Sequence, residues 1–346
     1  MTPLPHPLPD FPGESMKTAY THTHDEYAVL RESCGLLDYT DIGLVRVSGP
    51  GAADFLGQVA TRGVEFLLEG QSMTALLLRA DGTLLSEILV HCHTGHYLVE
   101  IWPAQAPEAT EHLLTRGALA PDTTVQDVRE EFDVLAVEGP ASFRIAQKYL
   151  PFPVASMGYR SFVTAEHDGR PLTVSRTGVT GEYGYKFFAP AGAGEALRAE
   201  FTALGAVECG KDAVDVCRME VRFASVEHEA ADGRATAVDL GLQWMIEPGK
   251  EPAGTGDQPR RPVCWVGAEE MTERPSHGTA VTAGDTTVGV ITHAVWSPRL
   301  ARVIGTAQVD TEVAASGQEF ALADGTALRT VSAPFLTATS LDVALD

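Results

Sequence analysis

The chain has 346 residues and a formal net charge of −22, from 25 Lys plus Arg against 47 Asp plus Glu. This length is long for one core and suggests two or three packed domains, and the 44% of hydrophobic residues is ordinary for a globular protein. The acidic balance repels phosphate backbones and anionic membranes. We therefore expect neither nucleic acid nor a membrane as a partner.

The start of the chain, residues 1–16, is rich in proline and lacks a basic region followed by an apolar stretch. We therefore expect it to be a disordered segment and not a secretion signal. No apolar run in the chain approaches the roughly 20 residues that span a bilayer, so we expect the protein to be cytoplasmic. The five cysteines have no paired short spacing, which predicts reduced thiols rather than disulfides or a zinc site.

The first third of the chain predicts a helix followed by strands. Residues 24–36 have helical spacing and stop at Gly35, and residues 41–47 alternate as a short strand. Residues 74–102 predict two strands and the start of a third. The Asp81-Gly82 pair between apolar runs indicates a hairpin turn.

The remaining elements mix helices and strands without a regular βαβ rhythm, which favours an α+β fold. The spacing predicts, in chain order, a helix at 106–116, a strand at 132–137, a helix from 141, a strand at 170–175, helices at 193–204 and 210–221, and a linker at 247–262. Residues 263–346 alternate short β segments with turns, as a small barrel would.

Glu87 lies in the predicted strand 84–91 and is the strongest catalytic candidate. Period-2 alternation puts it on one face with Leu85, Leu89 and His91. A carboxylate on this mostly apolar face is either exposed at an edge or held inside, where burial raises its pKa and lets it exchange protons near neutral pH.

The loop 176–185 is a second candidate, because its three glycines allow a planar ligand to approach the backbone closely. Glu182 in this loop offers two coplanar acceptors to an amino-pyrimidine edge; the alternative is a hairpin loop with a solvated carboxylate. Arg218 lies on the helix 210–221, where it either anchors a ligand carboxylate or pairs with Asp215.

His91 and His93 share a strand face, as paired metal ligands can, but no set of carboxylates or thiols lies beside them in the sequence. We therefore predict no metal site.

Taken together and in order, six segments resemble the glycine cleavage T-protein (aminomethyltransferase) family, over about residues 24–340. They are Gly35–Asp38 with Gly43 and Ser48-Gly49, Asp81–Val90, Glu138-Gly139-Pro140, Arg176–Tyr185, Asp215–Glu220, and Val288–Thr292 with Ser297-Pro298 and Leu300. The most specific, Arg176–Tyr185, is similar to the family pattern Arg-x-Gly-Tyr-Thr-Gly-Glu-Asp-Gly-Tyr.

The resemblance implies a three-domain cloverleaf around a central channel that binds tetrahydrofolate. The expected division is a first domain of residues 17–48 and 133–206, a second of residues 49–132 and 207–256, and a C-terminal β-barrel of residues 257–346. Nothing in the composition fixes these boundaries, which follow from the family likeness.

By the same resemblance, Glu182 holds the pterin, and Glu87 lies near the folate N5 and N10 nitrogens, where it stabilises the cationic transfer state and relays a proton. Four further residues are expected to bind folate: Val179, Tyr185, Arg218 and Trp102. Glu87 replaces an aspartate of the family pattern, so its carboxylate reaches one methylene further.

The departures from the family pattern concern the second substrate. Asp41 replaces a histidine, Ile101 an asparagine, Val179 a tyrosine and Arg222 a glycine. They indicate that the protein still binds folate but uses a different second substrate. This substrate is expected to be a small amine, a methyl donor or a carrier protein. Lipoyl carriers tend to be acidic, so a net charge of −22 favours the small molecule.

The expected function is transfer of an aminomethyl, methylene or formimino unit between tetrahydrofolate and an amine. Two alternatives remain at this point: a folate-dependent demethylase or methyltransferase, and a non-catalytic folate-binding accessory protein. The accessory subgroup carries a Lys-Gly-Cys-Tyr motif, whereas this chain reads Gly249-Lys250-Glu251.

Overall fold

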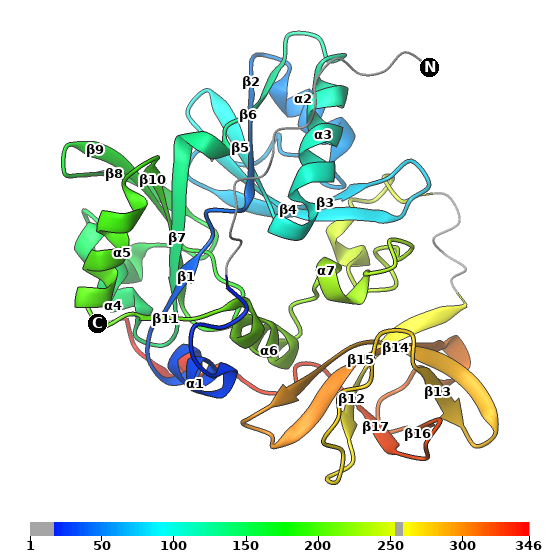
Figure 1. The fold of residues 1–346 in the computed structure, drawn as a ribbon. Helices are drawn as coiled ribbons and strands as arrows, with labels where there is room; N and C mark the ends of the chain where they lie inside the picture. Colours follow the sequence, from blue (N-terminus) through cyan, green and yellow to red (C-terminus); the bar gives the residue numbers. More distant parts are fainter. Residues whose placement is uncertain (1–16, 253–258, 346) are drawn as a thin grey trace.

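The computed structural model describes residues 17–252 and 259–345, so the proline-rich start and part of the predicted linker lie outside the described residues. Two sheets and a closed barrel surround helix α6 (Lys211–Val221), as Figure 1 shows. The architecture is α+β with a C-terminal β-barrel, as the sequence predicts.

The first sheet has six strands in the order β11-β1-β7-β10-β9-β8. Their bounds are β1 (Gly35–Asp38), β7 (Phe132–Glu138), β8 (Phe162–His167), β9 (Arg170–Ser175), β10 (Gly184–Pro190) and β11 (Val207–Glu208). One face packs under α4 (Ser142–Ala146) and α5 (Gly194–Ala203) through Phe143, Leu197 and Phe201. Alternation along β10 turns Tyr185 and Phe187 toward this core and leaves Lys186 and Phe188 on the opposite face.

The second sheet has five antiparallel strands in the order β3-β4-β5-β2-β6. Their bounds are β2 (Gly43–Ser48), β3 (Ser72–Leu78), β4 (Leu84–His93), β5 (His96–Ile101) and β6 (Thr124–Asp127). Helices α2 (Ala52–Val59) and α3 (Ala106–Gly117) cover one face with an apolar core. The other face is turned toward the channel described below.

A β-bulge changes the predicted face of one residue in β4. The pairing of β3 with β4 shifts between Leu77 and Leu78, which leaves Leu85 as the extra residue. Leu85 therefore packs in the α2–α3 core with Ile88 and does not share the face of Glu87, contrary to strict alternation.

The C-terminal barrel closes in the order β12-β15-β14-β13-β16-β17. Its strands are β12 (Arg260–Gly267), β13 (Ala280–Ala283), β14 (Thr286–Ser297), β15 (Arg302–Asp310), β16 (Glu319–Leu322) and β17 (Ala327–Val331). Trp265 fills its interior, and Val295 and Ile304 face outward into the same apolar cluster as α1 (Thr23–Glu32) and α6.

The strand pairing near two of the expected domain boundaries is clear. Residues 43–48 pair with β5 and β6 and belong to the five-stranded sheet. Residues 207 and 208 pair with β1, in parallel, and belong to the six-stranded sheet. Over the described residues, no helix is long and apolar enough to cross a membrane.

Candidate functional site

Two connected cavities lie where the sheets, α6 and the barrel meet, and we call them the inner and outer pockets. They share Glu87, Arg160 and Phe223. The inner pocket lies between the two sheets and encloses about 50 Å³. The outer pocket, about 510 Å³, opens between the segment after α6 and the barrel. Together they form a channel that narrows toward the six-stranded sheet.

Glu87 stands at the junction of the two pockets. It is 9% exposed, and within the described ranges its carboxylate accepts no hydrogen bond. Burial raises the pKa of this carboxyl, against the opposing influence of Arg218 and Arg160. An unpartnered carboxylate with a raised pKa, close to two guanidinium groups, can exchange a proton or stabilise a developing positive charge.

Three other buried polar atoms of the inner pocket also lack hydrogen-bond partners among the described residues: Tyr39 Oη, Thr74 Oγ1 and Arg218 Nε. Buried polar groups are nearly always satisfied, and each exception costs about 1–3 kcal/mol. Their convergence with Glu87 on one small cavity is the arrangement expected when a polar ligand completes the hydrogen bonding.

The inner pocket also holds an ion pair that the sequence analysis missed. Lys186 of β10 donates to Glu100 of β5, and His91 Nε2 lies 3.3 Å from the same carboxylate. Ser72 Oγ is 2.8 Å from His91 Nδ1 and extends the network. Burial would raise the pKa of Glu100, but Lys186 and His91 overcome that effect and hold the pKa at about 2. The pocket therefore carries a fixed buried cation beside a fixed anion.

Glu138, at the end of β7, organises the glycine loop that forms one wall of the inner pocket. Its Oε2 accepts hydrogen bonds from the backbone N–H of Val179 and Thr180, both 3.0 Å, and from Thr180 Oγ1 at 2.7 Å. Its Oε1 has one long contact, 3.3 Å from Val179 N. Gly178 packs against this carboxylate so closely that a Cβ there would lie 3.0 Å from Oε2.

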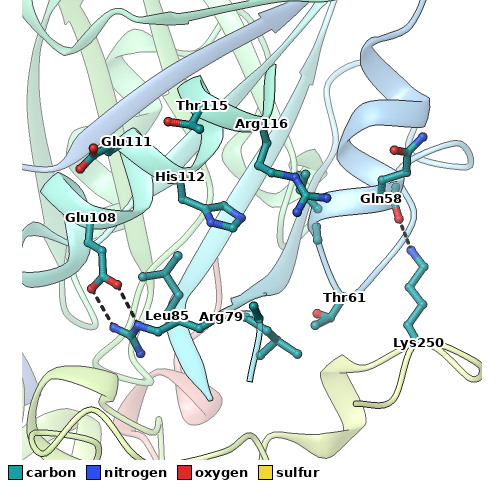
Figure 2. A pocket seen from close by; sticks show the side chains of 15 residues that line it. Gln58, Thr61, Arg79, Leu85, Glu108, Glu111, His112, Thr115, Arg116 and Lys250 are labelled. Atoms are coloured by element: carbon teal, nitrogen blue, oxygen red, sulfur yellow. Dashed lines mark hydrogen bonds and ion pairs between the residues drawn. The ribbon is translucent and has the colours of Figure 1, made fainter. Parts of the chain in front are cut away.

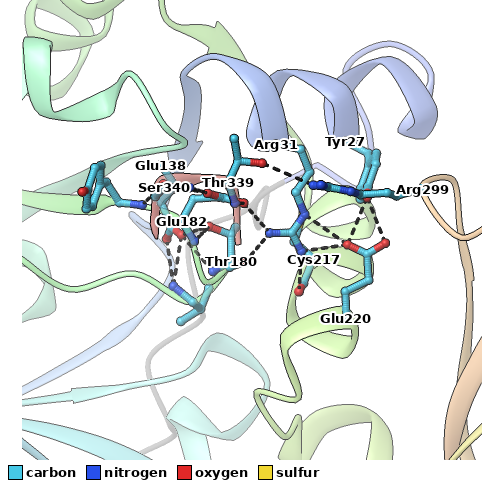
Figure 3. Close-up of polar contacts among 12 residues, drawn as sticks. Tyr27, Arg31, Glu138, Thr180, Glu182, Cys217, Glu220, Arg299, Thr339 and Ser340 are labelled. Carbon is cyan, nitrogen blue, oxygen red and sulfur yellow. Dashed lines mark hydrogen bonds and ion pairs between the residues drawn. The ribbon is translucent and has the colours of Figure 1, made fainter. Parts of the chain in front are cut away.

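Glu182 lies outside both pockets, in a buried junction that Figure 3 shows. Its Oε1 accepts from Arg31 Nη1 at 2.8 Å and from Thr339 N at 3.1 Å, and its Oε2 accepts from the N–H of Ser340 at 2.7 Å. Arg31 also pairs with Glu220, 2.8 Å from Nη2 to Oε2. Both oxygens of Glu182 are thus occupied by the protein, and the geometry does not support its expected contact with the pterin.

The other candidate residues divide into two groups. Val179, Arg218 and Trp102 line the inner pocket, and the Arg218 guanidinium stacks on Trp102 with its Cζ 4.5 Å from the ring centroid. Tyr185 is fully buried in the core under α4 and α5, on the opposite face of β10, so it does not reach the pocket.

Ile101, the position matched to the family asparagine, also points away from the channel into the α2–α3 core. Its neighbours Glu100 and Trp102 line the inner pocket instead. Strict alternation from Trp102 back along β5 would have identified Glu100 as a pocket residue.

A larger cavity, about 780 Å³, lies elsewhere, over α2, α3 and the turn between β3 and β4 (Figure 2). Three of its charged groups have partners within the protein: Arg79 donates to Glu108 at 2.7 and 2.8 Å, and Lys250 donates to the carbonyl of Gly57 at 2.7 Å. It contains none of the unpartnered atoms described above, so its size alone does not make it the functional site.

Comparison with known proteins gives consistent matches along the chain. The sequence model of the GCVT N-terminal domain matches residues 8–250, and that of the glycine cleavage T-protein C-terminal barrel domain matches residues 260–336. The aminomethyltransferase of Geobacillus kaustophilus is 31% identical over 327 residues, covering 90% of this chain and 88% of that protein. The aminomethyltransferase of Synechococcus elongatus is 28% identical over 320 residues, covering 89% and 86%.

The fold matches a solved structure as well. The glycine cleavage system aminomethyltransferase T of Bartonella henselae superposes with a TM-score of 0.80 at 20% identity, covering 91% of this chain and 90% of that one.

Proposed function

Because the chain belongs to the glycine cleavage T-protein family, we propose that it is a tetrahydrofolate-dependent one-carbon transferase of the aminomethyltransferase type. The observation that carries the proposal is the set of buried polar atoms without hydrogen-bond partners among the described residues, Thr74 Oγ1, Tyr39 Oη and Arg218 Nε, which lie around the inner pocket together with the buried carboxylate of Glu87. A reduced pterin has both donors and acceptors along its edge and can satisfy such a set.

The residues present suit tetrahydrofolate, which supplies the nitrogen that accepts the one-carbon unit. Glu138 Oε1, whose one contact is 3.3 Å long, is an acceptor for an amino-pyrimidine edge. Trp102, with Arg218 stacked on it, forms an aromatic wall. Glu138 thereby takes the role that the sequence analysis expected of Glu182.

Glu87 is the proposed catalytic residue. A carboxylate held in a site of low dielectric stabilises positive charge that develops on the transferred carbon, and its raised pKa suits it to relay the proton. Its position between the pockets supports the inner pocket as the folate side and the outer pocket as the side for the second substrate.

The second substrate is proposed to be a small amine. The outer pocket is lined by Glu87, Arg160 and Arg222, and charged groups of both signs suit a small zwitterionic or polar partner. The net charge of −22 disfavours an acidic carrier protein, although such a carrier remains the alternative to test.

The test is calorimetric titration of tetrahydrofolate into the wild type, Glu138→Gln and Glu87→Gln proteins. We expect Glu138→Gln to weaken binding by about 10- to 100-fold, because hydrogen bonds to charged groups are worth ~1.5–3 kcal/mol. Glu87→Gln should bind tetrahydrofolate with a Kd within about threefold of the wild-type value. Its rate of one-carbon transfer, measured by product mass with a panel of amines, should be lower by a factor of about 10²–10⁴.

Glu108→Gln, which alters the surface cavity of Figure 2, is the matched control and should change neither quantity. If the wild type binds no reduced folate, the proposed function fails. If Glu87→Gln keeps full transfer activity, the assignment of the catalytic carboxylate fails while the folate proposal survives.

A further inference from the structure

The interface between α6, α7 (Val226–Glu229) and barrel strand β14 holds three side chains whose ligand atoms all lie within 4.8 Å of one another: Asp215, His228 and His293. We propose that these side chains bind one divalent transition-metal cation of the zinc class, which fastens the barrel to the two helices. The site is separate from the channel, since none of the three lines either pocket.

The geometry is close to that of a bound metal. His293 Nε2 is 2.8 Å from Asp215 Oδ2, and His228 Nε2 is 3.7 Å from Asp215 Oδ1. The two imidazole rings are stacked, with centroids 4.6 Å apart and planes at 16°. Zinc bonds of about 2.1 Å at tetrahedral angles place ligand atoms roughly 3.4 Å apart, so small side-chain movements suffice.

Each ligand is held in place by structure that does not depend on the metal. The neighbour of His228, Glu229, forms a two-fold contact with Arg222 at 2.8 and 2.9 Å and caps the backbone of Ser225 at 2.9 Å, which fixes the short helix α7. Asp215 lies in the middle of α6. Rigid support of this kind is what a metal site requires.

His293 is aimed at α6 by an irregularity in its strand. The pairing of β14 with β15 shifts between Ile291 and His293, a β-bulge that leaves Thr292 as the extra residue. Thr292 is buried and bonds Thr306 at 2.8 Å, while His293 turns outward to Asp215. Bulges commonly re-aim a side chain in this way.

The chemistry of the three groups selects the metal. Two imidazoles and one carboxylate suit zinc and similar transition metals, whereas Mg²⁺ and Ca²⁺ prefer oxygen ligands throughout. Within the described ranges His228 has no polar partner other than Asp215, so its ring nitrogen is available. A fourth position remains for water, because the cluster is only partly buried.

A cation here would set the distance between the barrel and α6. Arg218, one turn beyond Asp215 on α6, lines the inner pocket, and Arg222 at the end of α6 contacts barrel residue Cys264 in the wall of the outer pocket. The metal would thus have a structural role. It would affect the channel only by fixing the position of α6 relative to the barrel.

The experiment uses the full chain, stripped with EDTA and dialysed. Zn²⁺ is titrated by calorimetry, bound zinc is counted by elemental analysis after gel filtration, and the melting temperature is followed with and without Zn²⁺. We expect one tightly held Zn²⁺ per chain, a melting temperature higher by several degrees, and intense visible absorption when Co²⁺ replaces Zn²⁺.

The double variant His228→Gln/His293→Gln should weaken this binding at least 100-fold. Glutamine at position 293 can still donate to Asp215, so the variant is expected to fold, which the melting curve without metal checks directly. His167→Gln is the matched control; it removes a histidine from the more exposed group around Glu200, and should leave the tight site intact.

The proposal is overturned if the wild type holds no more zinc than the double variant. It is overturned equally if Zn²⁺ binds but the melting temperature of the wild type is the same with zinc and with excess EDTA. Neither outcome affects the folate proposal, which is tested by a different ligand at different residues.

Discussion

At the scale of single residues, the unpartnered carboxylate of Glu87 makes stability depend on pH. Burial raises its pKa above the ordinary value of 4.5, so the folded state retains a proton that the unfolded chain has lost. The free energy of unfolding of the wild type should therefore fall as pH rises through the interval between 4.5 and the raised pKa.

Glu87→Gln removes this dependence. We expect the variant to gain stability relative to wild type as pH rises from 4 to 8, measured by urea denaturation at each pH. Glu111→Gln, at an exposed site on α3, serves as the control and should follow the wild-type profile. A constant difference between Glu87→Gln and wild type across the range would show that the carboxyl keeps its ordinary pKa.

The same scale shows what the sequence could predict of the site. Glu87 stands out in the sequence because a carboxylate interrupts an apolar strand face, a purely local pattern. The surroundings of Glu182 and Tyr185 could not be predicted, because distant residues set them: Arg31 and Ser340 donate hydrogen bonds to Glu182, and the helices over β10 bury Tyr185. The Lys186–Glu100 pair joins strands of two different sheets, which no local pattern indicates.

At the scale of elements, helix α6 ends in an unusual way. Arg222 at its C-cap has φ 60° and ψ 44°, a left-handed conformation that costs a non-glycine residue about 1 kcal/mol. Its side chain pairs with Glu229, which is only 3% exposed. The family pattern has glycine at this position, which adopts this conformation without strain. In this chain the ion pair between Arg222 and Glu229 offsets the cost of the left-handed backbone.

Arg222→Gly should relieve the backbone strain but leave Glu229 buried and unpaired. Because removing one partner of a buried pair costs ~3–5 kcal/mol, we expect a net loss of about 2–4 kcal/mol in the free energy of unfolding. The double variant Arg222→Gly/Glu229→Gln should recover most of that loss. Equal stability of the single and double variants would contradict the assigned balance.

Most elements could be predicted from the sequence, because their signals are local. The strand 170–175 and the helices 210–221 and 193–204 agree with the structure to within a residue or two. The bulges at Leu85 and Thr292 could not be predicted, since each depends on the register of the neighbouring strand.

At the scale of the whole molecule, the junction around Arg31 joins α1, α6, the six-stranded sheet and the barrel. Its guanidinium, 2% exposed, bonds Glu182 from the six-stranded sheet's loop and Glu220 from α6. Glu220 also accepts from Tyr27 of α1 at 2.9 Å and from Ser297 of the barrel. One guanidinium therefore pairs with two carboxylates, so the negative charge of the group is only partly neutralised.

Arg31→Met should therefore cost about 3–5 kcal/mol in the free energy of unfolding, because it leaves two buried carboxylates without a cation. Arg46→Met is the control; its pair with Glu131, 26% and 52% exposed, should contribute no more than about 1 kcal/mol. Both are measured by urea denaturation at neutral pH. Similar losses for the two variants would contradict the special role of Arg31.

The contact of Glu182 with Ser340 has a consequence for synthesis on the ribosome. Arg31 emerges early and Glu182 about midway, yet the carboxylate acquires its last hydrogen bonds only when residues 339 and 340 leave the exit tunnel. A nascent chain can build its sheets beforehand, but this carboxylate stays incompletely paired until then. A nascent chain that stalls before residue 339 should therefore keep a buried, incompletely paired carboxylate in its folded part, and such chains would be natural clients of chaperones.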